Sequence, residues 1–356
     1  MPTVVADTLR AFAQSLFEAG SVPADEAARV AESLVDANLA GHDSHGVIRI
    51  VQYVKAIDDG QLKPGVPLDV VQETPAVLVV DGHWGLGQVQ AHRLLERLIP
   101  KARQVGLAAG TLKHCGHIGR LGEYAEAAAK ERMALIATVN GHGYGRNVAP
   151  PGGVAGRIGT NPLCLGAPTA GDPVILDIGT SVAAEGKVRV AFNKKVPVPD
   201  GWLLDAKGQP TTDPSALYQE PPGTILPLGG PQAYKGFGIG LLLDIFAGGL
   251  SGAPCSHPGT PLRVANAVVF IAIDVGQFAG AGHFLREVGR LSAAVRECPR
   301  AAGVSEILLP GDPERKARER RRREGIPLDD GTWGQLTALA KRFGLSVPVA
   351  APTRAR

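Results

Sequence analysis

The alternation of apolar strand-like segments with helix-like segments is the feature that most constrains the fold of this chain. Strands are predicted where branched apolar residues cluster, at AVLVVDG (76–82), GLAAGTLKH (106–114), MALIATVN (133–140), PVILDI (173–178) and VANAVVFIAID (264–274). Apolar residues recur at helical spacing between the first three strands, over 86–104 and about 119–132. The alternation predicts an α/β domain.

The two ends of the chain are predicted to be helical instead. Residues 5–60 carry apolar residues at helical spacing, and the segment after Gly311 returns to helix and ends near Phe343. We therefore expect a small helical lobe, residues 1–65 with 313–356 returning to it, beside an α/β domain over 66–312. Within the α/β domain, 196–214 is predicted to be a long loop and 234–252 a buried helix.

The composition excludes several classes of protein. A net charge of +3 is too small for this length to suggest nucleic acid. The four cysteines are scattered without a CxxC pair, which is typical of reduced thiols in a cytoplasm. The N-terminus has no signal-peptide pattern, and no apolar run approaches the roughly 20 residues that span a bilayer. We expect a cytoplasmic location, with neither a membrane nor nucleic acid as partner.

One dense basic run, PERKARERRRREG (313–325), could suggest nucleic-acid binding. Glutamates interleave with its arginines, and this pattern is more typical of a solvated helix face.

The segment GHDSHGVIRIVQY (41–53) holds the first candidate site. If Asp43 or Ser44 caps a helix that runs to about Ile57, then His45, Arg49 and Tyr53 share one face of it. The helix N-terminus would keep His45 neutral, although Asp43 would act in the opposite direction. Arg49 could hold a carboxylate bidentately, and Tyr53 could donate to the same ligand. An ordinary solvated stripe remains the alternative.

The segment KHCGHIGRLGEYAE (113–126) holds the second candidate site. His117, Gly119 and Arg120 fall where a predicted strand gives way to a helix, which is where sites gather in α/β proteins. Free backbone N–H groups there, together with Arg120, would suit a phosphate. His114 and His117 form an HxxH pair, but no third ligand lies near, so no metal site is predicted.

The common nucleotide motifs fail in this chain. GLGQVQ (85–90) follows a strand and opens a helix, but it has glutamine at the sixth position and lacks the later acidic residue of a Rossmann fingerprint. No GxxxxGK[ST] motif occurs. A dinucleotide would therefore bind on another scaffold.

Eight segments in register resemble the type 2 malate/L-lactate dehydrogenase family, which is unrelated to the Rossmann-fold enzymes of similar name. They are GHDSHGVIR, CGHIGRLGEYAE, IGTNPLCLGAP, LDIGTS, EGKVRVA, GQPTTDP, YKGFGIGLLLDIFAGGLSG and ILLPGD, spread over roughly residues 10–340. The resemblance implies a family-specific, non-Rossmann α/β fold with a small helical lobe, a homodimer, and NAD or NADP as cofactor.

The resemblance also implies roles for individual residues. His45 and His117 would lie at the reaction site, with Ser44 orienting His45, and Arg49 and Tyr53 would face the substrate. The cofactor positions of the family match His45, Gly119, Arg120, Leu121, Ile175, Leu176, Asp177, Ile178, Gly179, Tyr234, Lys235, Asn266, Gly311, Asp312, Pro313 and Glu314. Position 312 is more often glutamate in the family, so the choice between NAD and NADP stays open.

We therefore expect reversible hydride transfer between nicotinamide and C2 of a 2-hydroxy acid such as malate, lactate or a larger 2-hydroxycarboxylate. His45 is the expected base, and His117 would polarise the same oxygen or support the proton path. A cyclic imino acid reductase and a ureidoglycolate dehydrogenase on the same fold are the alternatives, and a non-enzymatic nucleic-acid-binding protein is a remote one.

Overall fold

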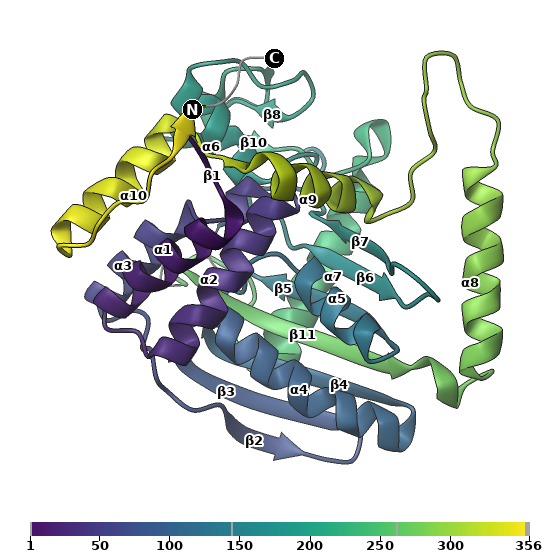
Figure 1. Cartoon of the computed structure of the whole chain (residues 1–356). Coiled ribbons are helices and arrows are strands. Elements are labelled where there is room, and N and C mark those ends of the chain that lie inside the picture. The colour runs from purple at the N-terminus through teal and green to yellow at the C-terminus, as the bar shows by residue number, and fades with distance from the viewer. Residues whose placement is uncertain (1, 144, 261–262, 353–356) are drawn as a thin grey trace.

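A seven-stranded mixed sheet forms the centre of the molecule (Figure 1). The computed structural model describes residues 2–143, 145–260 and 263–352. In spatial order the strands are β2 (Asp69–Glu73), β3 (Val77–Gly85), β4 (Leu107–Gly116), β11 (Ala265–Asp274), β5 (Met133–Asn140), β6 (Leu163–Ala167) and β7 (Val174–Ile178). The predicted α/β fold class is confirmed.

Strand direction brings three strand ends to one edge of this sheet. β3 pairs parallel with β4, and β11 runs antiparallel to both β4 and β5. β3, β4 and β5 therefore run the same way, and their carboxyl ends lie along the same edge. Residues that follow these strands are brought close together.

Helices cover both faces of the sheet. On β11, Val268 and Phe270 belong to the core beneath α4 (Gly87–Val105) and α5 (Gly122–Lys130). The alternate residues of the strand, such as Ala267 and Val269, pack towards α7 (Ala233–Ser251) on the other face. Both sides of the strand are buried, which explains why its sequence is continuously apolar.

The two ends of the chain share one helical core, as predicted. α1 (Ala6–Ala19), α2 (Ala24–Leu39) and α3 (Arg49–Asp58) bury their apolar faces together with residues of α10 (Asp330–Arg342). α9 (Asp312–Glu324) packs beside α2, and a small sheet joins β1 (Pro2–Val4) to β12 (Ile326–Pro327) and β13 (Ala351–Pro352). The exact division at residues 65 and 313 stays a prediction.

Several elements were not predicted. They include β2, β6, the strands of the small sheet, α6 (Glu185–Lys194) and α8 (Ala281–Arg296), which lies at the periphery of the molecule with no buried residue (Figure 1). The predicted loop carries two short strands, β8 (Leu203–Leu204) and β9 (Pro210–Thr211), which pair in a small sheet with β10 (Thr224–Ile225).

The prediction of a buried helix over 234–252 was wrong in one respect. α7 forms there, but Leu242, Phe246 and Leu250 expose about half or more of their surface (53%, 47% and 59%). Residues 230–251 are also long and apolar enough, by length and composition alone, to cross a membrane, contrary to the expectation that no such run exists. The apolar surface of α7 is thus only partly covered within one chain.

Candidate active site

The Asp43–His45 segment is a 3₁₀ turn rather than the start of a helix. α3 begins only at Arg49, so His45 does not share a helical face with Arg49 and Tyr53, and Asp43 and Ser44 are not its caps. The Gly46 φ of −89° with a ψ of −154° breaks the helix between them. Because Gly46 is extended, the prediction that His45, Arg49 and Tyr53 share one helical face was wrong.

Side chains of two helices, α2 and α9, hold this turn in place. Asn38, at the end of α2, donates to the Asp43 carboxylate at 2.6 Å and accepts from the Val47 backbone N–H at 2.8 Å. Arg321 of α9 donates to Asp43 through both terminal nitrogens, one of them at 2.9 Å. A Cβ on Gly46 would lie 2.2 Å from the Asn38 Oδ1, so only glycine fits there.

The turn places His45 against His117, which follows the end of β4. The two rings stack with centroids 5.4 Å apart and planes inclined by 23°, and Ser44 Oγ lies 3.0 Å from His45 Nδ1. Burial, then the charge of Arg49, lowers the pKa of His45 to about 3, and burial lowers the pKa of His117 well below 6.5. Both imidazoles are therefore neutral at pH 7.

Tyr53 joins His117 to the helical lobe. Its hydroxyl lies 2.6 Å from His117 Nδ1 and accepts a hydrogen bond from Gln88 Nε2 at 3.2 Å. Only 1% of Tyr53 is exposed, and burial raises the pKa of its hydroxyl to about 12. Tyr53 is thus a protonated partner of His117.

Arg49 is the cation beside the two histidines. Its Nε donates to the Ser44 carbonyl at 2.7 Å and its Nη1 to Gln52 at 2.9 Å. Within the described part of the chain, it forms no ion pair with a carboxylate. Its charge is therefore available to an acidic ligand.

A cavity of about 300 Å³ gathers several of the predicted cofactor residues: Arg120, Ile175, Asp177, Gly311 and Glu314. The Asp177 carboxylate accepts the backbone N–H of Gly122, at the first turn of α5, at 2.7 Å. A Cβ on Gly122 would lie 2.2 Å from the Arg120 guanidinium, so the backbone and Arg120 pack as closely as atoms allow. The Gly122 N–H is taken by Asp177, and Arg120 pairs with Glu126 at 2.9 Å, so the groups left to bind a dinucleotide here are mainly carboxylates, which suit ribose hydroxyls.

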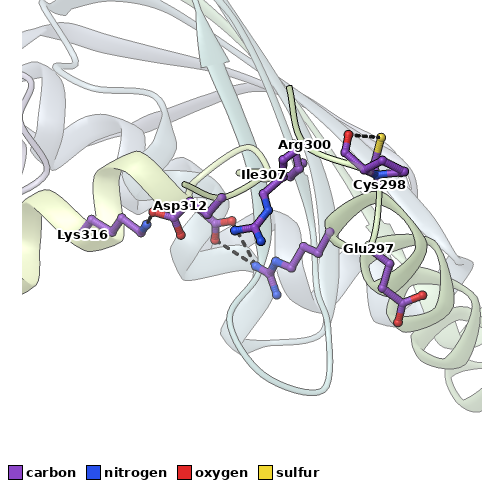
Figure 2. A pocket seen from close by; sticks show the side chains of 9 residues that line it. Glu297, Cys298, Arg300, Ile307, Asp312 and Lys316 are labelled. Carbon is purple, nitrogen blue, oxygen red and sulfur yellow. Dashed lines mark hydrogen bonds and ion pairs between the residues drawn. The ribbon is translucent and has the colours of Figure 1, made fainter. Parts of the chain in front are cut away.

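Asp312, another predicted cofactor residue, is instead held by arginines. It borders a larger cavity of about 680 Å³ between the end of α8 and the start of α9 (Figure 2). Arg296 donates to it at 3.0 Å, and Arg315 and the Leu309 backbone N–H also bond to it. Burial would raise the pKa of Asp312, but these hydrogen bonds outweigh burial and lower it. Its carboxylate therefore organises the start of α9.

Three other predicted cofactor residues lie elsewhere. Asn266 uses both ends of its amide within the protein, accepting from the Ile118 N–H and donating to the Asn140 carbonyl, each at 2.9 Å. It ties the residue after His117 to the end of β5. Tyr234 and Lys235, at the start of α7, do not line the 300 Å³ cavity; both are exposed, and α7 lies on the other face of the sheet.

The basic run forms α9, and one face of this helix contacts the rest of the protein rather than solvent. Arg315 bonds to Asp312, Arg318 to Glu126 at 3.1 Å, and Arg321 to the Asp43 carboxylate. The spacing of three residues puts these arginines on one side of the helix. They bind carboxylates around the site, so the solvated-face interpretation was wrong for this side.

Sequence reasoning missed three residues that support the site: Asn38, Gln88 and His42. His42 Nε2 lies 3.1 Å from Glu314 and so connects the turn to the cavity. Gln88 lies inside GLGQVQ, where the search for a Rossmann fingerprint considered only the glycines and the last glutamine. The available signal was a polar residue that directly follows a glycine, Gly87, at the predicted start of a helix.

The two histidines of the HxxH pair bond to different partners. His114 Nδ1 bonds to Asp81 at 2.9 Å, whereas His117 bonds to Tyr53. Among the residues that the structure describes, no three His, Cys, Asp or Glu side chains are grouped to hold a metal ion.

Comparison with known proteins decides the family. A family model described as malate/L-lactate dehydrogenase matches residues 4–337. The chain belongs to this family. It is 37% identical over 345 residues to hydroxycarboxylate dehydrogenase B of Escherichia coli, covering 96% of this chain and 94% of that protein.

Solved structures of the family share the fold. Malate dehydrogenase from Pyrococcus horikoshii superposes with a TM-score of 0.86 at 31% identity, covering 97% of this chain and 96% of that one. A Δ1-piperideine-2-carboxylate reductase from Pseudomonas syringae gives 0.82 at 28% identity, covering 96% and 100%. The protein is an oxidoreductase of the 2-hydroxy acid dehydrogenase type, and its family implies a nicotinamide cofactor and a small acid as substrate.

Proposed function

We propose that this malate/L-lactate dehydrogenase family member interconverts a 2-hydroxy acid and its 2-oxo acid at His45, His117 and Arg49. Bound NAD or NADP would supply C4 of the nicotinamide, which takes the hydride from C2 in oxidation and returns it in reduction. In oxidation the hydroxyl proton must leave at the same time, so a neutral base has to contact that oxygen. His45, with Ser44 beside its Nδ1, is the proposed base, and His117 contacts the same oxygen.

The single observation that carries this proposal is an unpaired guanidinium beside two stacked neutral histidines. Arg49 has hydrogen bonds to Ser44 and Gln52 but no carboxylate partner in the described chain. A substrate carboxylate would supply the missing partner bidentately and orient C2. We assign Tyr53 to His117 rather than to the substrate, because its buried hydroxyl already bonds there.

The proposed cofactor contacts comprise two groups. The cavity residues Arg120, Ile175, Asp177, Gly311 and Glu314, with Gly119, Leu121, Leu176, Ile178, Gly179 and Pro313 beside them, form the first. Tyr234 and Lys235 form the second and would contribute if a second copy of the chain covers α7. We therefore propose a homodimer through the exposed apolar face of α7. The domain division at 65 and 313 and a cytoplasmic location stay predictions.

A substrate panel tests the reaction class. NADH and NADPH oxidation would be followed with pyruvate, oxaloacetate, 2-oxoglutarate and hydroxyphenylpyruvate, using His45→Ala as the matched control. We expect turnover of at least one 2-oxo acid by the wild type and almost none by His45→Ala, with dinucleotide binding retained. Wild-type turnover in His45→Ala would remove His45 from the mechanism.

The similarity to a piperideine carboxylate reductase supports a second candidate, reduction of a cyclic C=N bond. The same arginine could hold the carboxylate of a cyclic imino acid. Activity on Δ1-piperideine-2-carboxylate, without activity on any 2-oxo acid, would replace the first proposal by this one.

A further inference from the structure

We propose that Gln88 sets the tautomer of His117 through Tyr53, so that His117 presents an Nε2–H donor to the substrate oxygen. The chemical consequence rests on the proposed function, but the tautomer itself does not. Gln88 thus acts as a positioning residue that touches neither substrate nor cofactor.

The direction of each hydrogen bond follows from the groups involved. An amide nitrogen can only donate, so Gln88 Nε2 donates to Tyr53 Oη at 3.2 Å. The hydroxyl has one proton and two possible acceptors, His117 Nδ1 at 2.6 Å and the His117 carbonyl oxygen at 3.5 Å, and we assign the proton to the much closer Nδ1. Nδ1 therefore accepts. A neutral imidazole whose Nδ1 accepts carries its proton on Nε2.

Close packing holds Gln88 in this position. Its residue is fully buried in the first turn of α4. The preceding Gly87 is so close to the end of β4 that a Cβ there would lie 2.3 Å from the Gly116 and His117 carbonyls. On the other side, a Cβ on Gly119 would lie 3.2 Å from Gln88 Nε2. The amide is thus confined between the residues that flank His117.

The protonation states of the neighbours keep the chain of hydrogen bonds in one direction. Burial raises the pKa of Tyr53 to about 12, so its proton is always present at neutral pH. Burial also lowers the pKa of His117 well below its usual value, so an imidazolium, which would donate from both nitrogens, does not form.

In this arrangement the two histidines have different roles: His117 donates a hydrogen bond, and His45 accepts the proton. A neutral imidazole N–H can polarise a carbonyl oxygen without giving up its proton. With Nδ1 occupied by Tyr53 and Nε2 protonated, His117 has no free lone pair for the proton that leaves the substrate in oxidation. That proton goes to His45, whose Nδ1 lies beside Ser44 and whose Nε2 has no hydrogen-bond partner among the residues that the structure describes.

The test is the tautomer of His117, measured by ¹⁵N NMR on full-length protein labelled at its histidines. His117→Gln identifies the signals. We expect a pyridine-type signal for Nδ1 and a pyrrole-type signal for Nε2 at pH 7.5, without any turnover being required. The opposite assignment in the wild type would overturn the proposal even if the Gln88 variant failed to fold.

Two variants test the role of Gln88. In Gln88→Glu the carboxylate accepts from Tyr53, whose oxygen must then accept from His117, so the tautomer should invert to Nδ1–H and kcat should fall at least tenfold. The matched control is Gln90→Leu, because Gln90 is equally buried on α4 but its side chain bonds to the Val66, Pro67 and Gly82 carbonyls and not, among the described residues, to Tyr53 or His117. It should leave the tautomer unchanged.

An unchanged tautomer in folded Gln88→Glu, or an inverted one in Gln90→Leu, would contradict the proposal. If the expected tautomers are found but no 2-oxo acid is turned over, the proposed function fails and the assignment of Gln88 stands.

Discussion

The burial of a neutral His45 makes the stability of the fold depend on pH in a defined way. Its pKa is lowered from 6.5 to about 3 in the folded protein, mainly by burial. As the pH falls below 6.5 the unfolded chain takes up a proton that the folded chain does not, so the free energy of unfolding decreases. Each pH unit between 6.5 and the folded pKa costs about 1.36 kcal/mol, and 1.5 units down to pH 5 therefore cost about 2 kcal/mol.

The assay compares urea unfolding at pH 7.5 and pH 5.0, followed by tryptophan fluorescence, in the wild type and His45→Gln. Other groups change stability with pH in both proteins, so the quantity of interest is the difference between the two pH responses. We expect His45→Gln to lose about 2 kcal/mol less than the wild type between these pH values. The variant His283→Gln, at an exposed histidine of α8, is the control. If the wild type and His45→Gln lose the same free energy of unfolding between pH 7.5 and pH 5.0, then His45 is not held buried and neutral in the folded protein.

Three further predictions concern the residues around the turn. Arg49→Met should lower kcat/KM for the acid substrate at least about 30-fold, or about 2 kcal/mol, mainly through KM, and dinucleotide binding measured by fluorescence should not change. Gly46→Ala should lower the free energy of unfolding by about 1–3 kcal/mol, because its Cβ would overlap Asn38; an unchanged urea midpoint would contradict this. Arg321→Gln should lower stability by only about 1 kcal/mol, since Asp43 is half exposed, but kcat should fall further because the turn carrying His45 loosens. Equal losses of kcat in Arg321→Gln and in the exposed Arg323→Gln would argue against this.

Much of the fold could be predicted because it follows from local patterns. The strands β3, β4, β5, β7 and β11 are rich in apolar residues, and each lies within a few residues of its predicted position. β6 was missed because LCLGA is short and half exposed, with Gly166 packed against Ala125 of α5. α8 was missed because its helical pattern buries nothing within this chain.

The helix α7 shows where a single sequence misleads. Its apolar residues predicted a buried helix, and the structure covers only one side of it. Composition shows that the surface of a helix is apolar. It does not show whether the residues that cover this surface belong to the same chain or to another. The exposed side of α7 is for this reason assigned to a second copy only as a proposal.

The candidate site was predicted by residue type better than by geometry. His45, His117, Arg49 and Tyr53 come together, but the helical face proposed for them does not exist, because Gly46 is extended. No spacing rule reveals that Tyr53 bonds to His117, since the contact joins residues 64 positions apart. Such long-range contacts depend on how α3 and the end of β4 pack, which a local pattern does not contain.

The most direct test of the account is the transfer of deuterium from nicotinamide to substrate. The enzyme would be incubated with NADH or NADPH deuterated at C4 and with each 2-oxo acid of the panel, and the products analysed by mass spectrometry. We predict a 2-hydroxy acid that carries one deuterium at C2 in the wild type, much less of it from Arg49→Met at the same subsaturating substrate concentration, and almost none from His45→Ala. No deuterated product from any 2-oxo acid would contradict the proposed reaction, and a deuterated cyclic amino acid from the imine would assign the chemistry to C=N reduction.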